Sequence, residues 1–146
     1  MVSTIFFANI FVLYMFHVSF LTAVILNRGY LEYWYPSYET ATKIDLTQYD
    51  IDFIDPNTFV QLVNLNELYL GNNLINNIDN ASTFDSLINL RVLSLSNNQL
   101  VSLNQNIFYG LTNLESVYLD RNPISLKQPT YVLSLCSTNP KCKIYL

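Results

Sequence analysis

The chain has 146 residues, of which 51% are hydrophobic, so it can form at most one domain with a packed core. Its net charge is -4 and it contains no run of Lys or Arg, which argues against binding to nucleic acid or to anionic lipid. The single histidine, His17, and the two cysteines leave little material for metal binding or nucleophilic catalysis.

The N-terminal residues 1–27 contain no Asp, Glu, Lys or Arg. Their apolar part, residues 5–26, exceeds the ~20 residues that a membrane-spanning helix needs. Small residues near its end, Thr22 and Ala23, are typical of a secretory signal. We therefore expect residues 1–27 to be a signal peptide and the protein to be secreted. The alternative is an uncleaved single-pass anchor through residues 5–26, in which case the protein contacts the membrane only through this segment.

Residues 28–40 are rich in tyrosine and contain the only tryptophan, Trp34. They directly precede a set of repeats that begins at residue 41. The first unit of a repeat array has an open apolar end that another segment must cover. We expect residues 28–40 to be this N-terminal cap; the alternative is an exposed aromatic patch that binds a partner.

Residues 41–124 contain one pattern four times, over 41–64, 65–89, 90–113 and a partial copy at 114–124. The clearest copy places apolar residues at Leu90, Leu93, Leu95 and Leu100 around Asn98. Equivalent positions in two other copies are Leu65, Leu68, Leu70, Asn73 and Ile75, and then Leu114, Val117, Leu119, Asn122 and Ile124. A fixed period of this length indicates one structural unit that buries its apolar face only by stacking on its neighbours.

This spacing resembles the leucine-rich repeat family, in particular the receptor-type repeats of about 24 residues. The resemblance implies an α/β-type solenoid: a short curved coil with a parallel β-sheet on its concave face and irregular or short helical segments on its convex side. The recurring Phe59, Phe84 and Phe108 are expected to fill the core on that convex side.

Alternation along each short strand divides the side chains between the core and the concave face. Leu93 and Leu95 are expected to point inward, and Val92, Ser94 and Ser96 outward. The resemblance implies that partners bind the outward face. The candidate partner-binding residues there are Lys43, Asp45, Glu67, Tyr69, Ser94, Tyr118 and Asp120.

Asn73, Asn98 and Asn122 occupy one position in successive repeats. A buried amide can satisfy both the N–H and the C=O groups of the turn that leaves each strand. These residues resemble the asparagine ladder of the family and are expected to be structural. The first repeat has Tyr49 at this position, so we expect it to be looser or specially capped.

The C-terminal residues 125–146 are expected to form a cap. Asn139 and Pro140 predict a turn between two short apolar runs, and a disulfide between Cys136 and Cys142 would close it. Two thiols without a nearby histidine are too few for a metal site. Asn80-Ala81-Ser82 is a sequon for N-glycosylation. The alternative is that Asn80 is an unmodified asparagine in a loop.

Together these features predict a non-enzymatic module without a cofactor or metal that binds a protein, or less favourably a carbohydrate, on its concave face. If the leader is cleaved, the chain retains no histidine for acid–base catalysis. The alternative is a membrane-anchored protein, or a truncated receptor-like decoy or scaffold. The family resemblance suggests innate-immune or adhesion roles for either.

Overall fold

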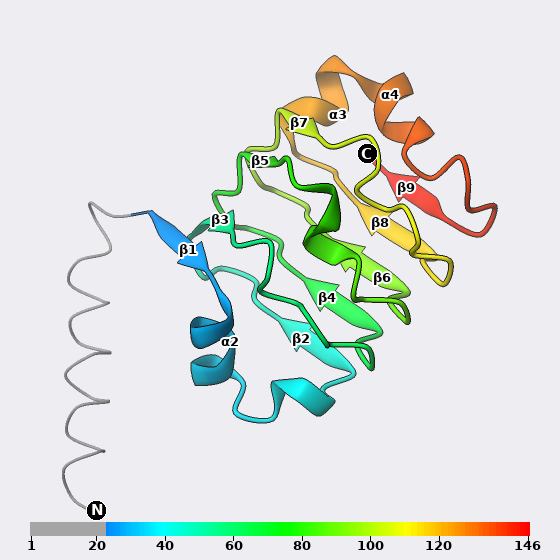
Figure 1. Cartoon of the computed structure of the whole chain (residues 1–146). Helices are drawn as coiled ribbons and strands as arrows, with labels where there is room; N and C mark the ends of the chain where they lie inside the picture. Colours follow the sequence, from blue (N-terminus) through cyan, green and yellow to red (C-terminus); the bar gives the residue numbers. More distant parts are fainter. Residues whose placement is uncertain (1–22) are drawn as a thin grey trace, which may run out of the picture.

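The computed structural model describes residues 23–146, which form a stack of successive coils with two helices and a last strand at its C-terminal end (Figure 1). The elements are β1 (Val24–Leu26), α2 (Arg28–Trp34), η1 (Tyr38–Thr40), β2 (Lys43–Asp45), β3 (Ile51–Ile54), β4 (Glu67–Tyr69), β5 (Asn77–Ile78), η2 (Ala81–Phe84), β6 (Val92–Ser94), β7 (Ser102–Leu103), β8 (Ser116–Tyr118), α3 (Pro123–Lys127), α4 (Pro129–Ser134) and β9 (Lys143–Tyr145). This is the solenoid that the repeats predict.

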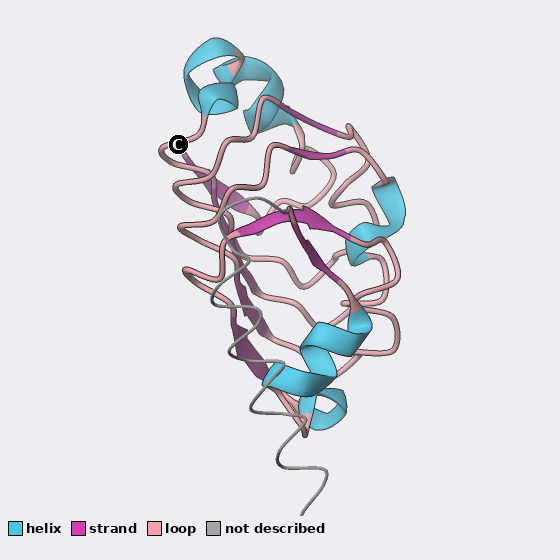
Figure 2. Cartoon of the chain, turned by 90° about the vertical axis from the view of Figure 1, so that its left-hand side faces the viewer, coloured by secondary structure: helices cyan, strands magenta, loops and turns pink. Residues whose placement is uncertain are grey.

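One face of the coil is a parallel sheet in the order β2-β4-β6-β8-β9. Each strand contributes three residues, whose central side chain is directed into the core, as Leu93 is in β6. Figure 2 shows these strands along one side of the coil, with loops and short helical turns on the other. Two small parallel sheets, β1-β3 and β5-β7, complete the coil away from the large sheet.

The core consists of the repeated apolar positions. The inward leucines and isoleucines of the four repeats are buried, and so are Phe59, Phe84 and Phe108. The rings of Phe59 and Phe84 stack with centroids 5.9 Å apart. The expectation that this phenylalanine column belongs to the core is confirmed.

The N-terminal end is closed by β1, α2 and η1. The Asn27 side chain caps α2 by accepting a hydrogen bond from the Tyr30 N–H. Leu31 and Tyr38 are buried. The Trp34 ring lies between those of Tyr30, at 5.1 Å, and Tyr49, at 4.6 Å between centroids. These aromatic residues therefore pack on the first repeat, and Tyr49 turns outward to meet them.

β1 changes the boundary expected after residue 27. Leu26 is fully buried, β1 pairs with β3, and the Val24 N–H donates to the Asp52 carboxylate at 2.8 Å. The folded part therefore includes residues 24–26, which the sequence analysis assigned to the signal peptide. The sequence could not separate them, because a buried strand and a signal peptide are both apolar. Residues 1–22 and the rest of the signal or anchor prediction lie outside the described part. Within residues 23–146 no helix has the length and hydropathy to span a membrane.

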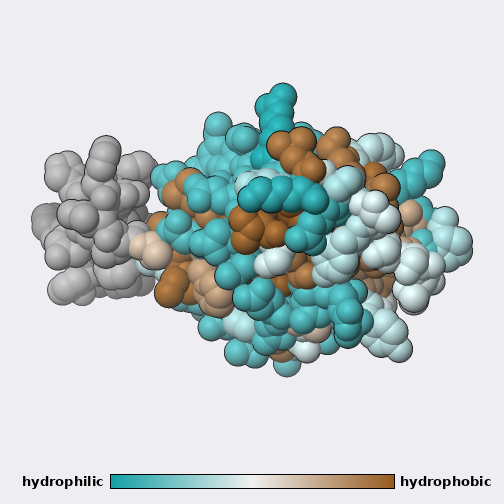
Figure 3. All heavy atoms as spheres, turned by 90° about the horizontal axis from the view of Figure 1, so that it is seen from above, coloured by the Kyte–Doolittle hydropathy of each residue, from teal (hydrophilic) through white to brown (hydrophobic). Residues whose placement is uncertain are grey.

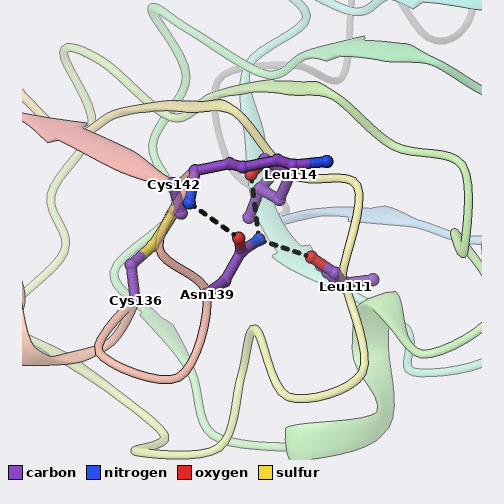
Figure 4. The surroundings of a disulfide bond; sticks show 6 residues. Leu111, Leu114, Cys136, Asn139 and Cys142 are labelled. Carbon is purple, nitrogen blue, oxygen red and sulfur yellow. Dashed lines mark hydrogen bonds between the residues drawn. A yellow bond between two sulfur atoms is a disulfide. The ribbon is translucent and has the colours of Figure 1, made fainter.

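The C-terminal end is closed by α3, α4 and a disulfide between Cys136 and Cys142. Inside the disulfide loop, the Asn139 side-chain amide donates to the carbonyls of Leu111 at 3.1 Å and Leu114 at 3.0 Å (Figure 4). The chain then forms β9, which pairs with β8. The expected cap is therefore also a fifth strand of the sheet.

Candidate partner-binding face

The candidate residues on the concave face lie in columns across the sheet. Lys43, Glu67, Val92, Ser116 and Lys143 are register partners in the first column. Asp45, Tyr69, Ser94, Tyr118 and Tyr145 form the second. The common period of the four repeats fixes this register.

Lys43, Glu67 and Tyr69 form a cluster near one end of the face. The Lys43 ammonium lies 3.4 Å from the Glu67 carboxylate and 4.6 Å from the centroid of the Tyr69 ring. The Tyr69 hydroxyl donates to Glu67 at 3.1 Å. Burial raises the pKa of the Tyr69 phenol above its ordinary value, and the hydrogen bond to Glu67 raises it further. Tyr69 is therefore a neutral hydrogen-bond donor at neutral pH.

Tyr118 and Tyr145 form an aromatic pair at the other end. Their rings are stacked, with centroids 4.7 Å apart and planes 14° apart. Tyr145 was not among the residues predicted from the sequence, because residues 144–146 were read only as a short apolar run. The alternation Lys143-Ile144-Tyr145, which matches Ser116-Val117-Tyr118, is the signal that could have identified it.

A third group lies just beyond the strands. The Ser96 hydroxyl donates to the Asp120 carboxylate, and the Asn97 N–H donates to the Asp120 carbonyl at 2.9 Å. A Cβ atom on Gly71 would lie 3.3 Å from the Ser96 carbonyl oxygen, so a larger residue there would crowd the neighbouring turn. The turns thus continue the register of the strands, and Asp120 stays at the edge of the face.

Asp45 is at the edge strand β2, where Tyr35 covers the backbone. The Tyr35 hydroxyl donates to the Asp45 carbonyl and accepts a hydrogen bond from the Asp45 N–H at 3.0 Å. The pKa of Tyr35 is raised, mainly by burial. The N-terminal cap therefore satisfies the exposed edge of the sheet while leaving the Asp45 side chain at the surface.

The asparagines that follow strands β4, β6 and β8 are buried beneath the concave face and stabilise the turns by which the chain leaves these strands. The Asn98 side chain accepts from the Ile75 N–H at 3.1 Å and donates to the carbonyls of Leu70 at 2.9 Å and Leu95 at 3.0 Å. Asn73 and Asn122 make equivalent bonds, each joining its own turn to that of the preceding repeat. These contacts match those expected of the asparagine ladder.

The model of the family described as "Leucine rich repeat" matches residues 79–124, which include two of these asparagines. The chain therefore contains leucine-rich repeats, and its solenoid is the fold of that family. No curated protein sequence matches it. The following similarities to solved structures extend the repeat fold over most of the chain.

Three solved complexes contain similar leucine-rich repeat structures. The TLR13–ssRNA13 complex gives a TM-score of 0.70 and 27% identity over 84% of this chain and 16% of that one. The LRIM1/APL1C complex gives a TM-score of 0.60 and 26% identity over 67% of this chain and 17% of that one. The Toll–Spatzle complex of Drosophila gives a TM-score of 0.68 and 23% identity over 83% of this chain and 16% of that one. This chain thus spans about a sixth of the length of each of these three chains.

Asn80 lies outside the large sheet, at the start of η2. It is exposed, and its side-chain oxygen accepts a hydrogen bond from the Ser82 N–H at 2.8 Å. A glycan on Asn80 would leave the concave face open. In the described residues, no group of three or more His, Cys, Asp or Glu side chains is arranged to hold a metal ion.

Proposed function

We propose that this chain is a secreted, non-enzymatic recognition protein that binds a protein partner on its concave face. The observation that carries the proposal is the register of the large sheet. It brings three tyrosines and several charged side chains from separate parts of the chain onto one surface. Their rigid strands lose little conformational freedom on binding.

The similar structures support a protein as the partner. LRIM1 is in a complex with APL1C, and Toll with Spatzle. TLR13 is in a complex with ssRNA13, but the net charge of -4 and the absence of a Lys/Arg run disfavour RNA here. The sole histidine, His17, lies in the apolar leader, which disfavours acid–base catalysis on this face.

The disulfide and the Toll neighbour support a secreted protein. A disulfide is stable mainly in oxidising compartments. Loss of the leader up to Ala23 would leave β1 and all later elements in the chain. We therefore favour a cleaved signal peptide over a membrane anchor, with Asn80 as a glycosylation site. The complex of Toll and Spatzle is described as a hub of development and innate immunity, which supports an immune setting.

The test uses the full chain expressed in a secreting host, with its mature N terminus sequenced. Immobilised wild type and a Tyr69→Ala/Tyr118→Ala variant are exposed to the same extracellular fluid. Truncating two aromatic anchors should weaken binding of a true partner more than about 100-fold. The purified partner is then titrated by calorimetry. The matched control is Tyr109→Ala, whose side chain is 73% exposed outside the large sheet.

The proposal fails if wild type and the double variant bind the same proteins with equal affinity. It also fails if Tyr109→Ala loses the partner as fully as the double variant. Both variants must first unfold at a midpoint close to that of the wild type, so that a loss of binding reflects the removed rings and not a loss of structure.

A further inference from the structure

The second column of the concave face is interrupted by one small residue. Tyr69, Ser94 and Tyr118 are register partners on the neighbouring strands β4, β6 and β8. The two tyrosines are therefore two strands apart, about 9 to 10 Å at the backbone. The side chain of Ser94 is too small to fill the space between two tyrosines at this spacing, and we call Tyr69, Ser94 and Tyr118 the tyrosine slot.

The contacts of each ring show which way its faces are turned. Lys43 lies over the Tyr69 ring from β2, on the side of β4 away from Ser94. Tyr145 stacks on Tyr118 from β9, on the side of β8 away from Ser94. The second face of each ring is consequently turned toward β6. The tyrosine slot has two aromatic walls that face each other across Ser94.

The slot has room for one flat group. Tyr118 and Tyr145, on adjacent strands, stack at 4.7 Å. A planar group above Ser94 would lie about 4.8 Å from each wall, because it would occupy the position of the intervening strand. That spacing is within the range for aromatic stacking and for a cation over a ring.

The charges beside the slot favour a cation. Glu67 lies next to Tyr69 and pairs with Lys43 at 3.4 Å, and Asp120 follows Tyr118 by two residues and lies 3.9 Å from the Arg121 guanidinium. Each of the two carboxylate side chains is still 39% exposed. Val92, Ser116 and Ser96, which also border the slot, are uncharged. Lys43 is behind Tyr69 and Lys143 is on β9, beyond β8. Two partly exposed carboxylates thus border the opening and can accept further hydrogen bonds from a cation.

We propose that the tyrosine slot binds the guanidinium group of an arginine on the protein partner. This inference rests on the proposed function and names the chemistry of its central contact. A guanidinium is planar, remains charged and stacks on aromatic faces, and its N–H groups can donate to carboxylates. A lysine ammonium is not flat, and a phenylalanine ring has no charge for Glu67 and Asp120.

The experiment titrates the full chain with N-acetyl-arginine amide, N-acetyl-lysine amide and N-acetyl-phenylalanine amide. Binding is followed by NMR of the tyrosine ring protons. The arginine probe should bind about tenfold more tightly than either of the others, and should shift the Tyr69 and Tyr118 signals. Equal binding of the lysine probe, or tighter binding of the phenylalanine probe, would overturn the proposal.

Two variants identify the site. Ser94→Tyr fills the slot and should abolish binding of the arginine probe. Thr47→Tyr adds a ring of the same size just after the edge strand β2, outside the slot, and should leave binding of the probe unchanged. Glu67→Gln with Asp120→Asn should reduce arginine binding several-fold but leave phenylalanine binding unchanged. Arginine binding that survives Ser94→Tyr in a folded protein would contradict the inference.

The two proposals can fail separately. If no probe binds but the Tyr69→Ala/Tyr118→Ala variant loses its partner, the concave face still binds a protein and the arginine slot is wrong. If the arginine probe binds in the slot but the same variant keeps its partner, the slot is real and the partner binds elsewhere.

Discussion

The two ends of the coil expose the same kind of apolar layer but close it differently. At the N-terminal end, buried Leu31 and a stack of aromatic rings around Trp34 cover the first repeat. At the C-terminal end, a disulfide loop and strand β9 cover the last. The first solution depends on side-chain burial and the second partly on a covalent link, so they should respond to different perturbations.

The hydrogen-bond ladder ends differently as well. At the C-terminal end the Ser125 hydroxyl donates to the Leu119 carbonyl at 2.6 Å, which an asparagine of a further repeat would otherwise do. At the N-terminal end Tyr49 contributes its backbone N–H, which donates to Asn73 at 3.0 Å. Ser125 thus takes the place of a further asparagine at the C-terminal end, whereas Tyr49 takes part in the ladder through its backbone.

The surfaces of the two ends also differ. The C-terminal helices leave Leu126 87% exposed and Leu133 53% exposed. Viewed from above, this side of the molecule shows hydrophobic side chains interspersed with hydrophilic ones (Figure 3). At the N-terminal end Arg28 instead donates to the Tyr38 hydroxyl at 2.9 Å and lies 3.5 Å from Glu39. The aromatic cap therefore has a polar outer rim.

The largest effect is expected from Leu31→Ala, which removes the buried centre of the N-terminal cap. The cavity should lower the free energy of unfolding by about 2 to 5 kcal/mol. The measurement is denaturant unfolding followed by circular dichroism. Tyr33→Ala on the same helix is the control, since its side chain is 49% exposed, and it should change stability far less. Equal effects of the two variants would show that the cap is not packed on the first repeat.

A smaller effect is expected from Asn98→Ala, between the two ends. It leaves the buried Ile75 N–H without its partner and removes one donor each from the carbonyls of Leu70 and Leu95. Stability should fall by about 1 to 3 kcal/mol, the usual cost of an unsatisfied buried polar group. The exposed neighbour Gln99→Ala is the control. An unchanged unfolding midpoint for Asn98→Ala would refute a stabilising ladder.

The interior of the coil could be predicted from the sequence, but the ends only in part. Each interior repeat has the same neighbours, so one pattern fixes the alternation, the register and the asparagine contacts together. An end has a neighbour on one side only, and any apolar segment can cover it. β1 therefore could not be distinguished from the apolar residues that precede it in the sequence, and the Tyr118–Tyr145 stack depended on the unrecognised strand β9.

An effect close in size to that of Asn98→Ala is expected at the C-terminal end, from Cys136→Ser combined with Cys142→Ser. The two cysteines are separated by only six positions, so the bond restricts a short loop of the unfolded chain. Its removal should lower stability by about 2 kcal/mol on the chain-entropy model. Asn139 still bonds to Leu111 and Leu114 in the variant, so we expect β9 to remain paired.

Unfolding in the presence and absence of a reducing agent separates the covalent contribution from the packing. The wild type in reducing agent should match the double serine variant, whereas the variant itself should not respond to the agent. The Leu31→Ala variant should lose the same further stability on reduction as the wild type, because distant sites contribute additively. A much larger loss in that variant would mean that the two ends are coupled through the intervening repeats.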